Sequence, residues 1–163
     1  MITADQLVAH AIGDYILQSD WMASKKRTES AAAFAHALTY TLCFLPWLLT
    51  SASGSSAFWR SFVICATHYL IDRYGLARYV VWAKNFLAPR WMELGAFVSL
   101  PSAGNDAPPS FYGTGTYVRN LPWSQCQGTG YPTDRPPFLA VWLLIIADNV
   151  LHVLINGAAL RWL

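Results

Sequence analysis

Histidine and aspartate recur four residues apart within the most hydrophobic stretches of this 163-residue chain. In an α-helix, that spacing places two side chains on the same face. Imidazole and carboxylate groups are costly to bury in apolar surroundings unless they pair with each other or coordinate a metal. Because three segments carry such a pair, we expect these segments to converge on one site. The pairs are His10/Asp14, His68/Asp72 and, in reversed order, Asp148/His152, while the fourth histidine, His36, stands alone.

The chemistry best suited to such a cluster is the binding of one or two divalent ions. Imidazole with carboxylate is compatible with Zn, Mn, Fe or Ni, and we favour Zn or Mn. An ion with an open ligand position could lower the pKa of a bound water to about 7 and so create a nucleophile. The aspartates could complete the metal shell, orient the imidazoles or serve as general base. The candidate metal ligands are His10, Asp14, His36, His68, Asp72, Asp148 and His152, and the candidate catalytic residues are Asp14, Asp72 and Asp148.

Two other interpretations of the same residues stay open. Polar side chains in membrane helices often hydrogen-bond across helices and simply hold a bundle together. A proton or ion pathway is a further alternative, favoured if Asp14, Asp148 and His152 line a continuous wet path. An isolated His–Asp pair would favour the structural interpretation, but three pairs together with His36 favour the metal site.

The composition indicates that membrane helices position these residues. The chain is 55% hydrophobic, 15% aromatic and only 12% charged, whereas ordinary soluble domains are roughly 25% charged. A net charge of +2, scattered along the chain, gives no indication of nucleic-acid binding. Amphipathic aromatic residues favour the membrane–water interface. Five tryptophans lie at or near the ends of apolar segments: Trp21, Trp47, Trp59, Trp82 and Trp162.

Four apolar segments are expected to form an all-α membrane bundle with three to four transmembrane segments. Residues 4–17 form a short segment, interrupted at Gly13 and Asp14, that either spans with its flanks or is re-entrant. Residues 31–50 are long enough to cross the hydrocarbon core, which takes about 20 residues, and Pro46 is expected to kink them. Residues 57–71 continue as a basic, aromatic stretch along the membrane surface, and residues 138–160 form the clearest span.

The organisation we expect is a single membrane domain, residues 1–163, with residues 89–137 as an inserted, irregular polar loop. Nine of the eleven Lys and Arg residues lie between the first and second segments or between the third and fourth. The positive-inside rule therefore places these regions in the cytoplasm of a bacterial inner membrane. A lipid-borne substrate could reach the site from the cytoplasmic leaflet, and a homo-oligomer is compatible with this arrangement. The candidate substrate-binding residues are Arg73, Gln18 and Asn149.

Four stretches of the sequence together resemble an uncharacterised family of small membrane proteins from bacteria and their phages, catalogued as domain of unknown function 3307. They are HAIGDYILQSDWMASKK from His10, the lone His36, THYLIDR from Thr67 and IIADNVLHVLI from Ile145. The resemblance includes all four apolar segments but not the loop 89–137. It brings no established activity, so it implies an uncharacterised membrane protein and nothing about chemistry.

The function we expect is a membrane-embedded metal-binding protein, namely a metal-dependent hydrolase that acts on a lipid-borne or membrane substrate. The alternative is a non-enzymatic phage or bacterial membrane protein that acts on the host envelope or on a membrane partner. In that alternative the His/Asp residues form a structural polar network. Metal stoichiometry separates the two, because only the enzyme needs the ion.

Overall fold

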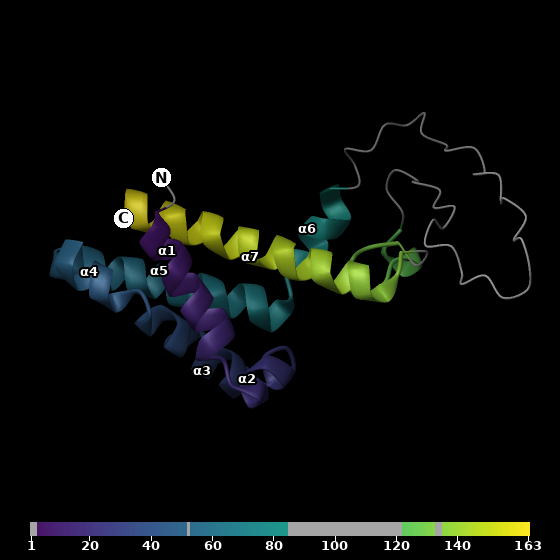
Figure 1. Cartoon of the computed structure of the whole chain (residues 1–163), viewed down its shortest axis with the longest axis horizontal. Coiled ribbons are helices and arrows are strands. Elements are labelled where there is room, and N and C mark those ends of the chain that lie inside the picture. The colour runs from purple at the N-terminus through teal and green to yellow at the C-terminus, as the bar shows by residue number, and fades with distance from the viewer. Residues whose placement is uncertain (1–2, 52, 85–121, 133–134) are drawn as a thin grey trace, which may run out of the picture. The chain divides into compact units, whose positions relative to one another are not determined.

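The computed structural model describes residues 3–51, 53–84, 122–132 and 135–163 (Figure 1). These residues are helical apart from turns and one isolated bridge between Cys126 and Pro132, which confirms the all-α prediction. The chain forms two compact units: Met1–Ala77 with Asp148–Leu163, and Arg78–Ala147. The predicted loop 89–137 falls within the second unit and lies largely outside the described residues.

The first apolar segment is a helix that changes its winding. Helix α1 (Ala4–Ala11) begins at Thr3, whose side chain accepts a hydrogen bond from the Gln6 amide, and passes into a π-helical turn, η1 (Ile12–Ile16). The Leu17 amide donates to the Ile12 carbonyl, five residues back. Such π-turns are rare and often lie at functional sites. Here the turn contains Asp14, and the short helix α2 (Asp20–Lys25) follows it.

The second apolar segment is broken where the proline predicted a kink. Helix α3 (Ser30–Leu42) stops before Cys43 and Phe44, and helix α4 (Leu45–Ser51) continues beyond them. Pro46 has no amide hydrogen, and its ring would clash with the carbonyl four residues earlier, so an α-helix cannot run through unchanged. The Cys43 and Phe44 amides donate three residues back, to Tyr40 and Thr41, which tightens the end of α3.

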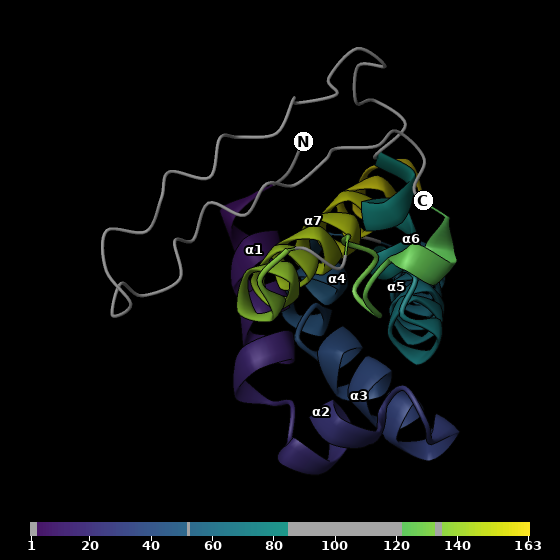
Figure 2. The ribbon, with the colours of Figure 1, turned by 90° about the vertical axis from the view of Figure 1, so that its right-hand side faces the viewer.

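Helix α5 (Gly54–Tyr74) lies antiparallel to the second half of helix α7 (Pro137–Trp162). Ser56, near the start of α5, donates to the carbonyl of Leu163, whereas Asp72, near the end of α5, faces His152. Helix α3 packs against α5, and α2 packs against α3. Both views show α1 beside the second half of α7 (Figures 1 and 2), where Gln6 donates to the carbonyl of Val153.

The first unit buries polar as well as apolar side chains and exposes large apolar ones. Its apolar core consists mainly of small and aromatic residues, among them Ala9, Tyr40 and Phe44. Eight polar side chains are also buried: Gln6, His10, His36, Thr41, His68, Asp72, His152 and Asn156. The outer faces of the helices expose large apolar side chains, including Ile16 (72% exposed), Phe34, Leu42, Phe58, Phe62 and Leu154.

Among the described residues, α7 is the one helix that is both long and apolar enough to cross a membrane. Only 17% of its most apolar 18-residue stretch is buried. Helix α5 has sufficient length but contains Arg60, Asp72 and Arg73, and α3 alone has 13 residues. The number of membrane spans therefore stays a prediction.

The second unit contains most of helix α6 (Ala77–Ala83), the short 3-10 helix η3 (Trp123–Gln125) and the first half of α7. Val81, Tyr131 and Ala140 form its buried core. Lys84 donates to the Tyr131 hydroxyl (2.8 Å). Gly130 has φ +85°, and a Cβ there would lie 2.2 Å from the Arg78 carbonyl oxygen, so this turn requires glycine. The candidate site lies wholly in the first unit.

Candidate metal centre

The centre of the site consists of two histidines from different helices. His36 on α3 and His68 on α5 are buried, and their Nε2 atoms lie 2.9 Å apart. The phenol ring of Tyr40, one turn beyond His36, stacks on the His68 ring with a centroid separation of 3.7 Å. Packing therefore fixes both imidazoles with their Nε2 atoms directed at the same point.

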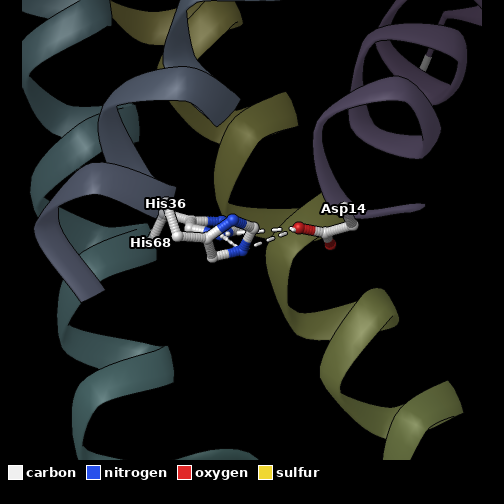
Figure 3. Close-up of side chains that lie close together, drawn as sticks. All are labelled: Asp14, His36 and His68. Atoms are coloured by element: carbon white, nitrogen blue, oxygen red, sulfur yellow. Dashed lines mark hydrogen bonds and ion pairs between the residues drawn. The ribbon is translucent and has the colours of Figure 1, made fainter. Parts of the chain in front are cut away.

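Two aspartates direct their oxygens at these same nitrogens. Asp14 Oδ1 lies 3.3 Å from His36 Nε2 and 3.5 Å from His68 Nε2, as Figure 3 shows. Asp72 Oδ2 lies 3.1 Å from His36 Nε2 and 3.2 Å from His68 Nε2. We call these four residues the central cluster. Asp14 reaches it from the π-turn η1, and Asp72 reaches it from the last turn of α5.

Hydrogen bonds alone cannot account for this arrangement. Each Nε2 faces three atoms at once, the other Nε2 and two carboxylate oxygens, but an imidazole nitrogen offers one hydrogen or one lone pair. The two distances from Asp14 also exceed the usual hydrogen-bond range of about 2.7–3.2 Å. Ligands about 2.1 Å from one ion lie about 3.0 Å apart at a right angle and about 3.4 Å apart at the tetrahedral angle. The separations of 2.9–3.5 Å in the central cluster fall around these values.

Two overlapping groups of residues could hold a metal ion. One is Asp14, His36 and His68, and the other is His68, Asp72 and His152; in each group the ligand atoms lie within 4.8 Å of one another. His68 belongs to both groups, and a neutral imidazole has one ring lone pair with which to bind one ion. The two groups therefore describe one shared site better than two independent sites. Asp148 reaches this site only through His152, with Oδ2 3.5 Å from His152 Nε2.

Four buried polar atoms of these residues have no hydrogen-bond partner among the described residues: Asp14 Oδ1, His36 Nδ1, His68 Nδ1 and His152 Nε2. A buried polar atom without a partner costs about 1–3 kcal/mol. Asp14 Oδ1 faces imidazole nitrogens and His152 Nε2 faces carboxylate oxygens, which is the arrangement expected of ligands in a metal-free site. The chemistry of the donors, imidazole nitrogen with carboxylate oxygen, also fits a divalent ion such as Zn or Mn.

The carboxylates do not occupy the supporting position that metal-bound histidines usually have. A metal-bound imidazole commonly donates through its other nitrogen to a carboxylate or carbonyl. Here Asp14 and Asp72 face the same Nε2 atoms that face each other, and Nδ1 of His36 and His68 is without a partner among the described residues. This geometry makes Asp14 and Asp72 candidate ligands rather than supports behind the histidines.

His10 lies beside the central cluster in a different environment. Its Nδ1 is 2.7 Å from the Tyr40 hydroxyl, and its Nε2 is 2.7 Å from Asn149 Oδ1. The Asn156 amide donates to the same hydroxyl, so Tyr40 has its own hydrogen free to donate to His10 Nδ1. His10 Nε2 then carries the hydrogen that Asn149 accepts. We call His10, Tyr40, Asn149 and Asn156 the hydrogen-bonded group.

The hydrogen bonds use both nitrogens of His10, which contrasts with the predicted ligand role. His10 Nδ1 also lies 3.4 Å from Asp14 Oδ2, but in this tautomer Nδ1 has no hydrogen to donate to the carboxylate, so His10 borders Asp14 without a hydrogen bond to it. Tyr15, which is mostly exposed, donates to Asn149 Oδ1 (2.9 Å) at the edge of this group.

A lysine ammonium contributes a positive charge to the site. Lys26 Nζ lies 3.1 Å from Asp72 Oδ2. In the orientation that satisfies both neighbours, the Gln18 amide donates to the Asp14 carbonyl (2.9 Å) and accepts from Lys26 Nζ (3.1 Å). With the imidazoles neutral, the carboxylates of Asp14, Asp72 and Asp148 and the ammonium of Lys26 leave a formal charge of −2. A divalent cation would neutralise it.

The structure brings the predicted residues together, but not all of them contact the centre of the site directly. Asp14, His36, His68, Asp72 and His152 contact one another directly, His10 lies behind Asp14, and Asp148 contacts His152 with its side chain 28% exposed. The predicted convergence of three His–Asp pairs and His36 is therefore confirmed. Of the predicted substrate-binding residues, Gln18 and Asn149 border the site, whereas Arg73 donates to the Arg27 carbonyl and the Ser30 hydroxyl.

Lys26, Tyr40, Asn156 and Gln6 were not predicted as site residues. Three of them follow the rule that identified the aspartates, because each lies four residues from a histidine: Gln6 from His10, Tyr40 from His36 and Asn156 from His152. His36 is therefore not alone on its helix. Searching for any polar partner at this spacing, rather than for aspartate only, would have found them. No local pattern distinguishes Lys26 from the basic residues on either side of it.

The chain belongs to the family described as "Protein of unknown function (DUF3307)", whose model matches residues 2–91. The match includes His10, Asp14, His36, His68 and Asp72 but ends before the fourth apolar segment, which the sequence resemblance had included. No curated protein and no solved structure matches the chain. The matched region of this chain thus contains the whole central cluster, whereas Asp148 and His152 lie outside it.

Proposed function

We propose that this protein is a membrane-embedded enzyme that binds one divalent ion, Zn or Mn, and hydrolyses a lipid-borne substrate. The observation that carries the proposal is the central cluster, in which two imidazole nitrogens lie 2.9 Å apart and each lies 3.1–3.5 Å from two carboxylate oxygens. In this proposal His36, His68, Asp14 and Asp72 hold the ion, His152 borders it, and His10 belongs to the hydrogen-bonded group beside Asp14.

The distribution of polar and apolar residues supports the membrane setting. A soluble domain rarely leaves this much large apolar side chain exposed while it buries histidine, aspartate and asparagine. Residues such as Phe34, Leu42 and Phe62 face outward, and α7 is apolar enough to cross a bilayer. We propose three or four spans in a bacterial inner membrane, with the basic residues around Lys26 and Arg73 on the cytoplasmic side.

Hydrolysis is the reaction class that suits these donors. A divalent ion with an open position supplies an activated water and polarises a carbonyl or phosphoryl oxygen. Asp148 Oδ2 lies 3.5 Å from His152 Nε2 and the Asp148 side chain is 28% exposed, so Asp148 is the carboxylate placed to accept a proton as general base. Asp148, the most exposed carboxylate of the site, marks the side from which a substrate would approach.

The test is the metal content of detergent-purified protein without a histidine tag, measured by plasma mass spectrometry. The wild type should carry close to one equivalent of metal, and His36→Ala/His68→Ala and Asp14→Asn should carry almost none. Asp20→Asn is the matched control, because Asp20 is an exposed carboxylate in the first turn of α2. Circular dichroism and size-exclusion chromatography should show that every variant is folded.

Metal-loaded protein should then be assayed for hydrolysis of phospholipid and isoprenoid phosphate in mixed micelles, with and without a chelator. Chelator-sensitive hydrolysis that Asp148→Asn abolishes, without loss of metal, would support the enzymatic proposal. Folded wild type that never takes up metal would overturn it. That result would favour a structural polar network, in which protons on two imidazoles balance the charge of −2.

A further inference from the structure

Lys26 holds a position that a metal ion would compete for. Its Nζ lies 3.1 Å from Asp72 Oδ2, the oxygen that also faces His36 Nε2 at 3.1 Å and His68 Nε2 at 3.2 Å. Asp72 is almost fully buried, and 21% of the Lys26 side chain is exposed. The oxygen therefore has three nitrogens around it but only about two lone-pair positions.

An ion at this site and the Lys26 ammonium cannot share Asp72 at low cost. An ion about 2.1 Å from Asp72 Oδ2 would lie no more than about 5 Å from an ammonium held 3.1 Å from the same oxygen. A double and a single positive charge at that distance in a buried site repel strongly. One of the two must give up the carboxylate.

We propose that Lys26 is the resident cation of the metal-free site, that it holds Asp72 until a divalent ion displaces it, and that it thereby sets the affinity and the charge selectivity of the site. This inference rests on the proposed metal binding. Gln18 Oε1, 3.1 Å from Lys26 Nζ, provides a neutral partner that the displaced ammonium can keep.

The formal charges explain why a divalent ion, and not a monovalent ion, should displace the lysine. Three carboxylates and Lys26 leave a charge of −2. A monovalent ion in place of the ammonium would bring the same single positive charge, so the formal charge of the site would not change. A divalent ion brings the site to neutrality with Lys26 still beside it.

The first experiment measures the acylation of Lys26 in wild-type protein by a water-soluble amine reagent and mass spectrometry. Saturating Zn or Mn should increase the labelling of Lys26 several-fold, whereas NaCl or KCl at matched ionic strength should not. Lys25 is the internal control, because it is adjacent, half exposed and paired with Glu29 instead. Lys26 labelling that stays constant or falls when the divalent ion binds would overturn the proposal.

The second experiment compares Zn affinity in Lys26→Met and Lys25→Met by competition with a chelating indicator. Methionine keeps the length and apolar stem of lysine but removes its charge. Lys26→Met should bind Zn at least tenfold more tightly than the wild type, and Lys25→Met should match the wild type. If Lys26→Met does not fold, Lys26→Gln serves instead and should also bind Zn at least tenfold more tightly, because it too removes the competing charge.

The outcomes separate this inference from the proposed function. Metal-binding wild type whose affinity does not change in Lys26→Met would overturn the role of Lys26 and leave the metal site in place. Wild type that binds Zn weakly, with tight binding in Lys26→Met, would support both. If neither protein binds metal, both proposals fall.

Discussion

The central cluster and the hydrogen-bonded group are adjacent, buried and built from the same kinds of residue, but their polar atoms are used differently. In the hydrogen-bonded group, His10 has one partner for each ring nitrogen, and the Tyr40 hydroxyl connects it to Asn156. In the central cluster, the Nε2 atoms of His36 and His68 face each other and two carboxylates, while their Nδ1 atoms have no partner among the described residues. The first arrangement satisfies its ring nitrogens by hydrogen bonds among the described residues, and the second does not.

This contrast shows that burial and spacing alone do not separate a ligand histidine from a structural one. His10 and His68 both lie four residues from an aspartate, and both are buried. What separates them is the number of partner atoms that each ring nitrogen faces. Replacing residues of one group and then of the other should therefore affect different measurements.

The largest expected difference lies in metal affinity between His68→Gln and His10→Gln. His68→Gln removes a nitrogen shared by both candidate ligand groups and should weaken Zn binding by about 100-fold or more, as measured by indicator competition. Glutamine at position 10 can still hydrogen-bond with Tyr40 or Asn149, so His10→Gln should stay within about tenfold of the wild type. Equal losses in the two variants would show that His10 is itself a ligand.

The sequence was enough to predict the fold class and the His–Asp pairs of the site. The spacing of four identified His68/Asp72 and Asp148/His152 correctly, because both pairs lie on regular helices, α5 and α7. The pair His10/Asp14 also meets, at 3.4 Å, although the π-turn lies between its residues. Apolar segments of sufficient length, with Pro46 as a break, were enough to predict an all-α fold.

The rotation of each helix about its axis is what the sequence left undetermined. Which nitrogen of His36 faces Asp14, and which residue stacks on His68, depends on contacts between α3, α5 and the π-turn that no single segment encodes. The same holds for Lys26, whose basic neighbours Lys25 and Arg27 are equivalent in the sequence. Only the position of α2 beside the end of α5 selects Lys26 as the partner of Asp72.

A smaller effect, on stability, is expected from replacing Gly13. The absence of a side chain at Gly13 lets the π-turn lie close to α3, where Asp14 reaches the central cluster. A Cβ at Gly13 would lie 2.6 Å from Tyr40 Cδ2 and 3.2 Å from Tyr40 Cα. Gly13→Ala should lower the free energy of unfolding by about 1–3 kcal/mol, because the buried ring and backbone of Tyr40 have little room to move. Denaturant titration in detergent micelles would measure this.

The matched control for that variant is Gly54→Ala at the start of α5. A Cβ at Gly54 would contact nothing within 4 Å, so this replacement should be neutral or should stabilise the protein by up to about 1 kcal/mol. Equal destabilisation in the two variants would contradict the idea that the packing of Gly13 against Tyr40 is tight.

The smallest expected effect is that of Tyr40→Phe, which removes one hydroxyl from the hydrogen-bonded group and leaves the ring that stacks on His68. Polar contacts within membrane proteins contribute about 0.6 kcal/mol on average and at most about 1.7 kcal/mol. Tyr40→Phe should therefore lower the free energy of unfolding by about 1 kcal/mol, with little change in metal affinity. Tyr15→Phe is the control, because Tyr15 donates to Asn149 but is 61% exposed, and it should change stability less. If Tyr40→Phe instead abolished metal binding at unchanged stability, the boundary drawn between the two groups would be wrong, and the Tyr40 hydroxyl would belong to the metal centre.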